Sequence, residues 1–199
     1  MQPSKRFTNK RYWDVVLKEE KYFQLDLSNL GTVSNKVALD ICCGTGDLLV
    51  GLRILGYEVY GLDFSQTAII ETKKKLPNLH IYQIDLNKDK INLNQKFDLI
   101  TLQNSIAFII DKERVAMSIK EHLLDDGIFI LKTLVLEKEE YEESIMGLSK
   151  DISITQHDKK LIDSVFGNIV SESIVVINLR DGSGALSTTT VYTKNKGGL

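Results

Sequence analysis

The stretch that organises this chain is residues 37–49, VALDICCGTGDLL. Its first residues form an apolar run typical of a buried strand, and an acidic residue, Asp40, stands near the end of that run. A turn of small residues follows, in which Gly44 and Gly46 allow unusual backbone dihedrals and the close approach of a ligand. The chain then continues as an apolar helix, whose first free N–H groups favour electron-rich ligand groups. The pattern predicts a nucleotide-type pocket at the carboxyl end of the first strand of an α/β sheet.

The spacing inside this turn indicates which nucleotide it suits. A dinucleotide fingerprint requires a third glycine three residues after Gly46, and Leu49 stands there instead. The order of strand, acid and Gly-x-Gly turn resembles the first motif of class I S-adenosylmethionine-dependent methyltransferases. Residues 42–47, CCGTGD, are especially similar to the loop of the menaquinone and ubiquinone pathway C-methyltransferases. Cys42 departs from the broader pattern, in which this position is usually glycine. For the loop taken alone, a strand, turn and helix without a ligand is the alternative.

Composition bounds the class of protein. The 199 residues are 43% hydrophobic and 26% charged, as in an ordinary globular chain of one domain. A formal net charge of −2 gives no electrostatic footprint for nucleic acid or an anionic membrane, so neither is an expected partner. The two cysteines are adjacent, which excludes a disulfide framework and fits a reducing cytosol. No charged-then-apolar leader opens the chain and no apolar run approaches the ~20 residues of a membrane span, so we expect a cytoplasmic protein.

The hydrophobic pattern after the first motif alternates between strands and helices. Later strands are expected at residues 57–63, 79–86, 96–102 and 128–134, and a hairpin at residues 171–179 and 185–192. Helices are expected after Gly46, at residues 65–76, from residue 111 with a buried stripe that includes Leu123 and Leu124, and at residues 156–167. These elements predict an α/β fold: a Rossmann-like, doubly wound, mostly parallel seven-stranded sheet with a C-terminal antiparallel hairpin. Such a hairpin ends the sheet in the resembled family, and NAD-type domains lack it.

Acids also end the second and third predicted strands. Asp63 lies about 20 residues after the glycine turn, where a carboxylate accepts hydrogen bonds from both ribose hydroxyls. It is followed by Phe64, which can lie against an adenine face, and by Ser65, a ready helix N-cap. In the resembled family an acid in the position of Asp85 binds the adenine amine, and the N–H of the next residue, here Leu86, meets a ring nitrogen. The alternatives are that Asp63 only starts the next helix and that Asp85 is a loop acid.

The fourth predicted strand leads into a segment that we expect to face the reactants. Gln103 follows this strand at the carboxyl edge, where by resemblance it contacts the methionine part of the cofactor. The next residues include Asn104, Ser105 and Phe108, which the resemblance places toward the substrate. Near the end of the fifth predicted strand, Lys132 interrupts an apolar run. Its side chain either faces the substrate site, where it would attract an anion, or extends to the surface.

Residues 1–36 are expected to form an N-terminal helical lid and linker, and residues 37–199 the cofactor-binding domain. Tyr12 and Trp13 lie on the apolar side of an amphipathic pattern in the first segment. In the resembled family such a region covers the cofactor and forms part of the substrate wall. The alternative is a helix that these two aromatic residues only anchor to the domain. A second helix-prone segment, residues 137–150, is expected to shape the substrate pocket.

The resemblance implies an enzyme that moves a methyl group from S-adenosyl-L-methionine to a small-molecule acceptor by in-line displacement. The implied cofactor site consists of Asp40, Cys42, Cys43, Gly44, Thr45, Gly46, Asp63, Phe64, Ser65, Asp85, Leu86 and Gln103. No catalytic base is identified, and the scattered histidines predict no metal site. Two alternatives stay open: a non-catalytic S-adenosylmethionine-binding sensor or partner subunit, and a nicotinamide-dependent oxidoreductase, which Leu49 and the terminal hairpin disfavour. The sequence indicates neither the acceptor nor an oligomeric state.

Overall fold

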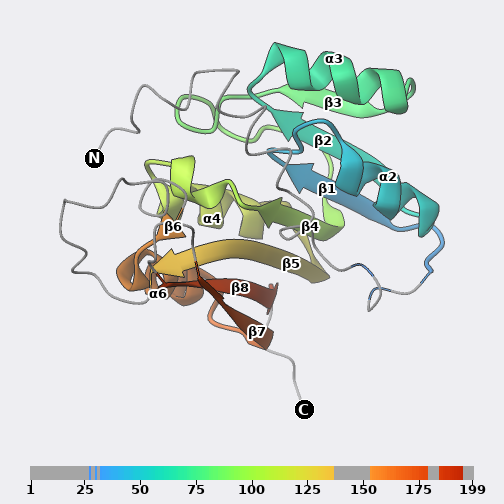
Figure 1. Cartoon of the computed structure of the whole chain (residues 1–199). Coiled ribbons are helices and arrows are strands. Elements are labelled where there is room, and N and C mark those ends of the chain that lie inside the picture. The colour runs from blue at the N-terminus through green and yellow to red at the C-terminus, as the bar shows by residue number, and fades with distance from the viewer. Residues whose placement is uncertain (1–26, 28–29, 31, 137–152, 179–183, 195–199) are drawn as a thin grey trace.

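The computed structural model describes residues 27, 30, 32–136, 153–178 and 184–194 of the chain (Figure 1). The strands are β1 (Val37–Ile41), β2 (Glu58–Asp63), β3 (His80–Gln83), β4 (Phe97–Gln103), β5 (Leu123–Leu136), β6 (Ser153–Ile154), β7 (Ile169–Asn178) and β8 (Gly184–Thr193). The helices are α2 (Asp47–Ile54), α3 (Gln66–Lys75), α4 (Lys112–His122) and α6 (Gln156–Phe166), and η3 (Ile106–Phe108) is a 3₁₀ turn.

The described strands form one eight-stranded sheet in the order β3-β2-β1-β4-β5-β8-β7, with β6 paired to β5 beside this path. Strands β3, β2, β1, β4 and β5 run parallel, whereas β8 is antiparallel to β5 and β7 is antiparallel to β8. The seven-strand path with its terminal hairpin confirms the predicted fold class. Because β1 to β5 are parallel, their carboxyl ends meet at one edge, and β1 stands between β2 and β4 at the centre of that edge.

Helices cover both faces of the sheet, so β1 is buried on each side. Helices α2 and α3 pack against β1, β2 and β3, and α4 and α6 pack against each other and against β5 on the opposite face (Figure 1). The apolar residues of β1 alternate between the two resulting cores, with Leu39 and Ile41 in one and Ala38 in the other. Burial on both faces explains why residues 37–41 form a nearly continuous apolar run rather than a strict alternation.

Local capping explains where the helices begin and end. Ser65 accepts a hydrogen bond from the backbone of α3, as predicted, and Asp111 caps α4 in the same way. Thr155 and Asp158 form a reciprocal capping box at the start of α6. This helix ends at Phe166 and is followed by Gly167, whose left-handed conformation (φ 69°) is typical of the residue that closes a helix.

Two predicted boundaries are wrong. Strand β3 ends at Gln83, so Asp85 lies in the following turn rather than in the strand. The N–H of Ile84, just after the strand, still donates to the Asp63 carbonyl at 3.0 Å. Strand β5 begins at Leu123, so Leu123 and Leu124, which were expected in the preceding helix, belong to the strand. The Asp-Asp-Gly sequence of residues 125–127 belongs to it as well. The register between β4 and β5 shifts at this point, which lets the extra residues remain in an irregular, bulged segment of the sheet. The predicted helices of residues 1–36 and 137–150 lie outside the described residues, apart from the last part of the first segment.

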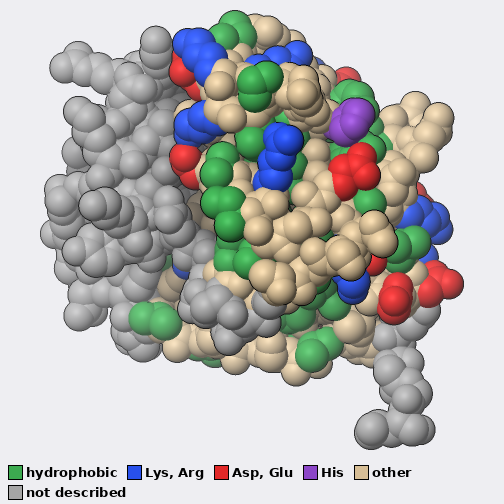
Figure 2. All heavy atoms as spheres, turned by 90° about the vertical axis from the view of Figure 1, so that its right-hand side faces the viewer, with side chains coloured by type: hydrophobic (Ala, Val, Ile, Leu, Met, Phe, Trp, Pro, Cys, Tyr) green, Lys and Arg blue, Asp and Glu red, His purple; other side chains and the backbone are tan. Residues whose placement is uncertain are grey.

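The surface mixes charges of both signs. On the face drawn in Figure 2, basic and acidic side chains lie among hydrophobic ones and are not gathered by sign. None of the helices that the structure describes is long and apolar enough to cross a membrane.

Candidate functional site

The glycine turn after β1 contains three residues with left-handed backbone conformations: Cys42 (φ 58°), Gly44 (φ 53°) and Gly46 (φ 79°). The two glycines are required for different reasons. A Cβ on Gly46 would lie 2.6 Å from Cγ2 of Thr72 on α3, so the close packing of that helix excludes a side chain. A Cβ on Gly44 would meet no atom of the described residues within 4 Å, so they leave space above the backbone there. The turn therefore leaves room for a ligand above Gly44.

Asp63 lies directly beside this open space. Its Oδ2 accepts a hydrogen bond from the Gly44 N–H at 2.9 Å, and its Oδ1 accepts one from the Ser65 N–H at 2.8 Å. The residue is 6% exposed, and burial raises the pKa of its carboxyl against the lowering effect of these backbone donors. An ionised carboxylate has about four acceptor positions. The Phe64 N–H is a third hydrogen-bonding neighbour of this carboxyl, and the carboxylate retains acceptor capacity for a ligand hydroxyl beyond these backbone bonds.

Thr72 is a contributor to the turn that the sequence analysis missed. Its fully buried hydroxyl donates to the Gly44 carbonyl at 2.8 Å and so holds the turn against α3. On the outer side of the turn, Thr45 donates to Asp47 at 2.8 Å, and Lys75 reaches both of them, at 3.3 Å and 2.6 Å respectively. The predicted cofactor residue Thr45 thus belongs to a surface network. Helix α3 supports the turn from both its buried and its exposed sides.

Asp40 is a buried carboxyl group without a cation. It is 1% exposed, and its Oδ1 accepts a hydrogen bond from the Thr101 hydroxyl on β4 at 2.7 Å. Burial raises the pKa of Asp40 to about 7, with a further contribution from the charge of Asp63 and against the effect of Thr101. Among the described residues, neither acid has an ion-pair partner. A buried acid with so perturbed a pKa is typical of functional sites.

The two cysteines lie within electrostatic range of these two acids. Burial is the main cause that raises the pKa of both thiols, and the negative charges of Asp63 and Asp40 raise it further. Both side chains are therefore neutral thiols near pH 7, which excludes them as nucleophiles in this environment. Ser105, from the segment after β4, is a hydrogen-bonding neighbour of the Cys42 thiol. The glycine turn thus contacts the segment that the sequence analysis assigned to the substrate.

The turn after β3 offers one acceptor and one donor. The Asp85 carboxylate accepts from the Asn87 N–H at 3.1 Å and from the Lys88 ammonium at 2.7 Å, and the latter bond lowers the pKa of Asp85. The N–H of Leu86 makes no hydrogen bond to any part of the chain that the structure describes. Phe64, at the end of β2, is 51% exposed and available for stacking. An acceptor beside a donor matches the amine and ring nitrogen at the edge of adenine.

The segment after β4 turns sharply at the same edge of the sheet. Gln103 ends β4 and is the register partner of Lys132 on β5. Asn104 has a left-handed backbone (φ 55°), and its N–H donates to the Lys132 carbonyl at 2.8 Å. The Ser105 hydroxyl donates to the Gln103 carbonyl at 3.1 Å, and Phe108 lies in η3. The structure therefore brings these predicted cofactor and substrate residues to one place.

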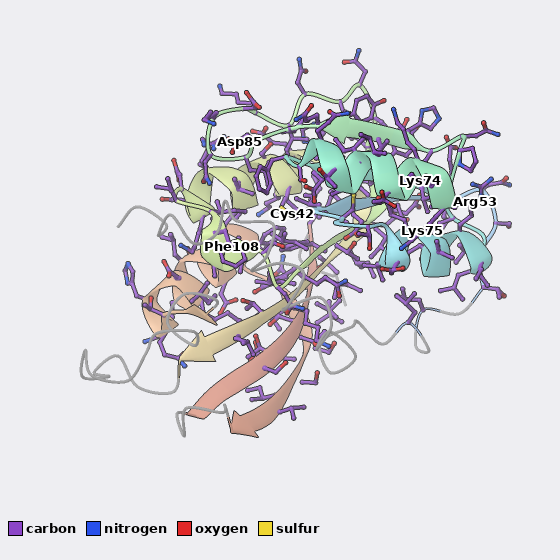
Figure 3. All side chains as sticks on the ribbon, turned by 45° about the horizontal axis from the view of Figure 1, so that its top comes forward. Cys42, Arg53, Lys74, Lys75, Asp85 and Phe108 are labelled. Atoms are coloured by element: carbon purple, nitrogen blue, oxygen red, sulfur yellow. The ribbon has the colours of Figure 1, made fainter. Side chains whose placement is uncertain are left out.

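Figure 3 shows how the predicted residues gather. In this view Cys42, Asp85 and Phe108 lie toward the left and centre of the ribbon. The labelled basic residues of α2 and α3, which are Arg53, Lys74 and Lys75, lie toward its right-hand end. The site is thus formed by the segments after β1, β2, β3 and β4, at the carboxyl edge of the sheet, as expected for an open α/β sheet. Tyr12 and Trp13 lie outside the described residues.

Comparison with known protein families agrees with this geometry. A family model described as a methyltransferase domain matches residues 32–181, which is most of the chain. The chain belongs to the class I S-adenosylmethionine-dependent methyltransferases. Its cofactor is S-adenosyl-L-methionine. The matched region includes the glycine turn, Asp63, the turn after β3 and the segment after β4.

The names of individual relatives indicate different substrates. A demethylmenaquinone methyltransferase of Lactobacillus johnsonii is 27% identical over 178 residues, which cover 75% of this chain and 73% of that protein. A ribosomal protein L11 methyltransferase of Campylobacter concisus is 29% identical over 127 residues, which cover 62% of this chain but only 43% of that protein. Among solved structures, a TehB-like methyltransferase of Corynebacterium glutamicum has a TM-score of 0.57 at 16% identity and covers 92% of this chain and 99% of its own. This last similarity concerns the fold alone.

The residues present fit S-adenosylmethionine. The space that the described residues leave above Gly44 admits a ligand against the backbone, and Asp63 retains acceptor capacity beside it. The unpaired N–H of Leu86 and the carboxylate of Asp85 match the two sides of an adenine edge. Asp40 and Asp63 have no cationic partner among the described residues, so this region suits a ligand that carries positive charge, as S-adenosylmethionine does.

Proposed function

We propose that this methyltransferase transfers a methyl group to a small-molecule acceptor bound between the glycine turn and the segment after β4. The observation that supports the proposal most directly is the buried Asp63 carboxylate, which two backbone N–H groups hold below the open space at Gly44. In this proposal Asp63 binds the ribose diol, and Asp85 and Leu86 bind the adenine edge. Phe64 stacks on the adenine ring, and the backbone of residues 42–46 lies along the methionine part.

S-adenosylmethionine, when bound, supplies a methyl group that is already attached to an excellent leaving group, so a nucleophile displaces it in line. The protein's task is then to orient the acceptor and to exclude water. We assign the orienting role to Asn104, Ser105 and Phe108, which follow β4, and to Lys132, whose ammonium would attract an anionic acceptor. A carboxylate, thiolate or neutral amine needs no protein base in such a reaction, whereas a phenol or carbon acid does.

A small acceptor is favoured by charge and by relatives. The net charge is −2, and acidic and basic side chains are mixed on the surface that Figure 2 shows, which offers no single-sign patch for a polyanion on that face. Relatives named as demethylmenaquinone and ubiquinone biosynthesis methyltransferases indicate that related chains act on small molecules. A relative named for ribosomal protein L11 is the counterexample that a test must include. A cytoplasmic location, which the two free cysteines favour, belongs to the same proposal.

Calorimetric titration tests the cofactor part of the proposal. Wild type, Asp63→Ala and the exposed control Glu121→Ala would be titrated with S-adenosylmethionine, S-adenosylhomocysteine and NADH. We expect micromolar binding of both sulfur ligands to wild type and to the control, and a loss of at least 100-fold in Asp63→Ala. That factor follows from two lost hydrogen bonds to a charged acceptor, each contributing about 1.5–3 kcal/mol. Binding of NADH without either sulfur ligand would overturn the proposal.

Turnover tests the acceptor part. Release of S-adenosylhomocysteine would be measured with a panel of phenols, amines, thiols and carboxylic acids, and separately with ribosomal protein. Methylation of a member of the small-molecule panel supports the proposal. Methylation of the protein alone would overturn the small-molecule assignment, and tight cofactor binding without turnover on any acceptor would favour a sensor or partner subunit.

A further inference from the structure

The turn that carries Asp85 and Leu86 is held in place by side chains from outside it. We call residues 85–89 the adenine turn and residues 104–110 the acceptor turn. Two further residues, Asn87 and Arg114, connect these segments, although the sequence analysis assigned neither of them a role. Each forms two hydrogen bonds to backbone groups, so each fixes the path of the chain rather than another side chain.

Arg114 holds the adenine turn from the first turns of α4. Its Nη2 donates to the Leu86 carbonyl, and its Nη1 donates to the Asp89 carbonyl at 3.1 Å. The helix cap Asp111 accepts from the Arg114 N–H at 3.0 Å and lies 3.7 Å from the guanidinium Nε, which restrains the arginine itself. The guanidinium presents its two donors in a fixed planar fork, which holds two carbonyls at a set separation, whereas a lysine ammonium does not fix that geometry.

Asn87 joins the adenine turn to the acceptor turn. Its Nδ2 donates to the Phe108 carbonyl at 3.0 Å, and its Oδ1 accepts from the Ile110 N–H at 2.8 Å. The side-chain amide therefore pairs with the backbone of the acceptor turn through both of its polar ends. The two partners lie 21 and 23 residues away in the sequence, and this link is formed only by the fold.

These bonds determine where Leu86 presents its N–H. The carbonyl of Leu86 is bound to Arg114, while its N–H has no partner among the described residues. The neighbouring Asp85 carboxylate is restrained by bonds from Asn87 and Lys88 within the same turn. A donor and an acceptor that must meet one edge of a base need a fixed separation. Residues that fix the turn therefore fix the hydrogen-bonding pattern that it recognises.

We propose that Asn87 and Arg114 are positioning residues that give the cofactor site its selectivity for adenine, by fixing the adenine turn to the acceptor turn and to α4. The inference rests on the proposed function of this site. Hypoxanthine is the informative competitor because it reverses the pattern of adenine: a carbonyl replaces the amine, and the ring nitrogen beside it carries hydrogen. If the adenine turn is held in place, the hypoxanthine carbonyl meets the Asp85 carboxylate, so that two acceptors face each other. The hypoxanthine ring N–H likewise meets the Leu86 N–H, so that two donors face each other. A turn that is free to move can avoid both conflicts.

The test compares the dissociation constants of S-adenosylhomocysteine and S-inosylhomocysteine by calorimetry. We expect wild type to prefer the adenine ligand by at least 100-fold, and Asn87→Ala and Arg114→Gln each to reduce this preference by at least tenfold. The more conservative Asn87→Asp and Arg114→Lys should reduce it less, because the first retains the acceptor for Ile110 and the second retains one donor. Asn92→Ala and Arg53→Gln, which change exposed residues of the same types, should leave it unchanged.

A residue with only a structural role would weaken both ligands equally, so an unchanged preference in folded variants would overturn this inference alone. Loss of selectivity in the conservative variants by as much as in the alanine and glutamine variants would also contradict the geometric assignment. If wild type bound neither ligand, the proposed function and this inference would fail together. Because the readout is a ratio of affinities, a fraction of misfolded protein affects both titrations alike and does not change the result.

Discussion

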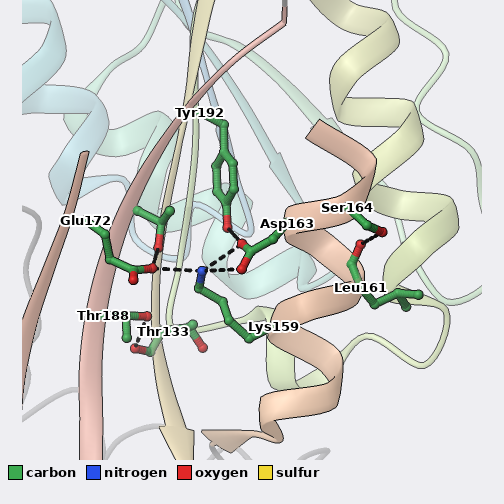
Figure 4. Close-up of polar contacts among 9 residues, drawn as sticks. Thr133, Lys159, Leu161, Asp163, Ser164, Glu172, Thr188 and Tyr192 are labelled. Atoms are coloured by element: carbon green, nitrogen blue, oxygen red, sulfur yellow. Dashed lines mark hydrogen bonds and ion pairs between the residues drawn. The ribbon is translucent and has the colours of Figure 1, made fainter. Parts of the chain in front are cut away.

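Asp40 beside the glycine turn and Lys159 beside the C-terminal hairpin are both buried ionisable groups, but the structure compensates them differently. At the turn, the carboxyl group of Asp40 has one hydroxyl donor from Thr101, and Asp63 has backbone donors. No cation pairs with either acid in the described part of the chain. At the hairpin, a buried lysine lies between two carboxylates that also receive hydroxyl donors (Figure 4). The first arrangement has no cation among the described residues, whereas in the second each charged group takes part in an ion pair.

The hairpin cluster is held by Lys159 on α6. Its ammonium lies 2.7 and 2.9 Å from the two carboxylate oxygens of Asp163 and 2.8 Å from Glu172 on β7. Tyr192 donates to Asp163 at 2.6 Å, and Thr190 donates to Glu172 at 2.7 Å. Burial tends to raise the pKa of Glu172, but the bonds from Lys159 and Thr190 outweigh it and hold the pKa below its usual value. Burial and then the bond to Asp163 raise the pKa of Tyr192.

The comparison shows that burial of charge does not by itself mark a site. A cluster in which each charged group has an ion-pair partner stabilises one packing arrangement. Two acids that share a buried space without a cation are under strain, which a cationic ligand relieves. We therefore assign the hairpin cluster to folding and the acid pair of the glycine turn to ligand binding. Each of the following predictions would weaken or strengthen that division.

The largest effect is expected at Asp40. Its folded-state pKa of about 7 exceeds the ordinary value of 3.8, so the folded protein holds this proton more tightly than the unfolded chain does. The corresponding stability is fully present below about pH 4 and is lost as the pH rises through about 7. Asp40→Asn keeps an acceptor for Thr101 and never ionises. Its free energy of unfolding should match that of wild type near pH 4 and exceed it by up to about 4 kcal/mol at pH 8, since one pKa unit corresponds to ~1.4 kcal/mol.

Urea unfolding of both proteins across this pH range gives the measurement. The exposed substitution Asp126→Asn serves as the control and should show no such divergence. The stabilised Asp40→Asn protein should bind S-adenosylmethionine more weakly than wild type, because the buried charge is retained for the ligand. A difference in stability that did not change with pH would remove Asp40 from the set of uncompensated charges.

The opposite result is expected at the hairpin. Lys159→Met leaves Asp163 and Glu172 without their cation, and since both carboxylates are partly exposed we expect the free energy of unfolding to fall by about 1–3 kcal/mol. Denaturant unfolding at pH 7 would measure the loss, with the neighbouring exposed Lys160→Met as the matched control. The affinity of the folded variant for S-adenosylhomocysteine should equal that of wild type. Weaker cofactor binding in the folded variant would mean that the two regions are not independent.

The sequence predicted the parts of the molecule whose signals are local. Residues 37–49 contain the first strand, its acid Asp40 and the glycine turn, and Asp63 ends the next strand. The positions of both acids at one edge of the sheet therefore followed from the strand pattern. The length of β3 did not, because it is an edge strand of four residues and the apolar alternation continues beyond its last hydrogen-bonded pair. The start of β5 was missed for a related reason. Residues 123–127 combine helix-like and turn-like patterns, and only pairing with β4 makes them part of the strand.

The residues that support the site were not predictable in this way. Thr72 contacts Gly44, 28 residues away, and Thr101 contacts Asp40, 61 residues away. A threonine inside a helix or strand has no local feature that distinguishes such a contact from ordinary packing. Lys159 was missed similarly, because a lysine in an amphipathic helix usually faces water. Its burial depends on carboxylates supplied by α6 itself and by β7.

A smaller effect is expected at Thr72. Thr72→Val keeps the shape of the side chain but leaves the Gly44 carbonyl without its donor, which should destabilise the protein by about 1–2 kcal/mol. Because that carbonyl belongs to the turn that faces the ligand, affinity for S-adenosylhomocysteine should also fall several-fold. Thr67→Val, on the exposed side of the same helix, should change neither quantity. Thermal unfolding and calorimetry on the same samples measure both effects, and a loss of stability with unchanged affinity would limit Thr72 to packing.

The smallest effect is expected at Tyr192, where it tests whether the hairpin cluster acts as a unit. Tyr192→Phe removes one hydroxyl donor to Asp163, which retains Lys159, so the loss of stability should be about 1 kcal/mol and the cofactor affinity should not change. If the cluster acts as a unit, the same change in the Lys159→Met background should have a clearly different effect. With the cation gone, the tyrosine hydroxyl is the remaining described donor to that carboxylate, and its removal should therefore be more damaging. Tyr82→Phe, which changes an exposed tyrosine on β3, is the control. Equal effects in the two backgrounds would show that the cluster is a set of separate bonds, and the contrast with the acid pair at the glycine turn would then rest on Lys159 alone.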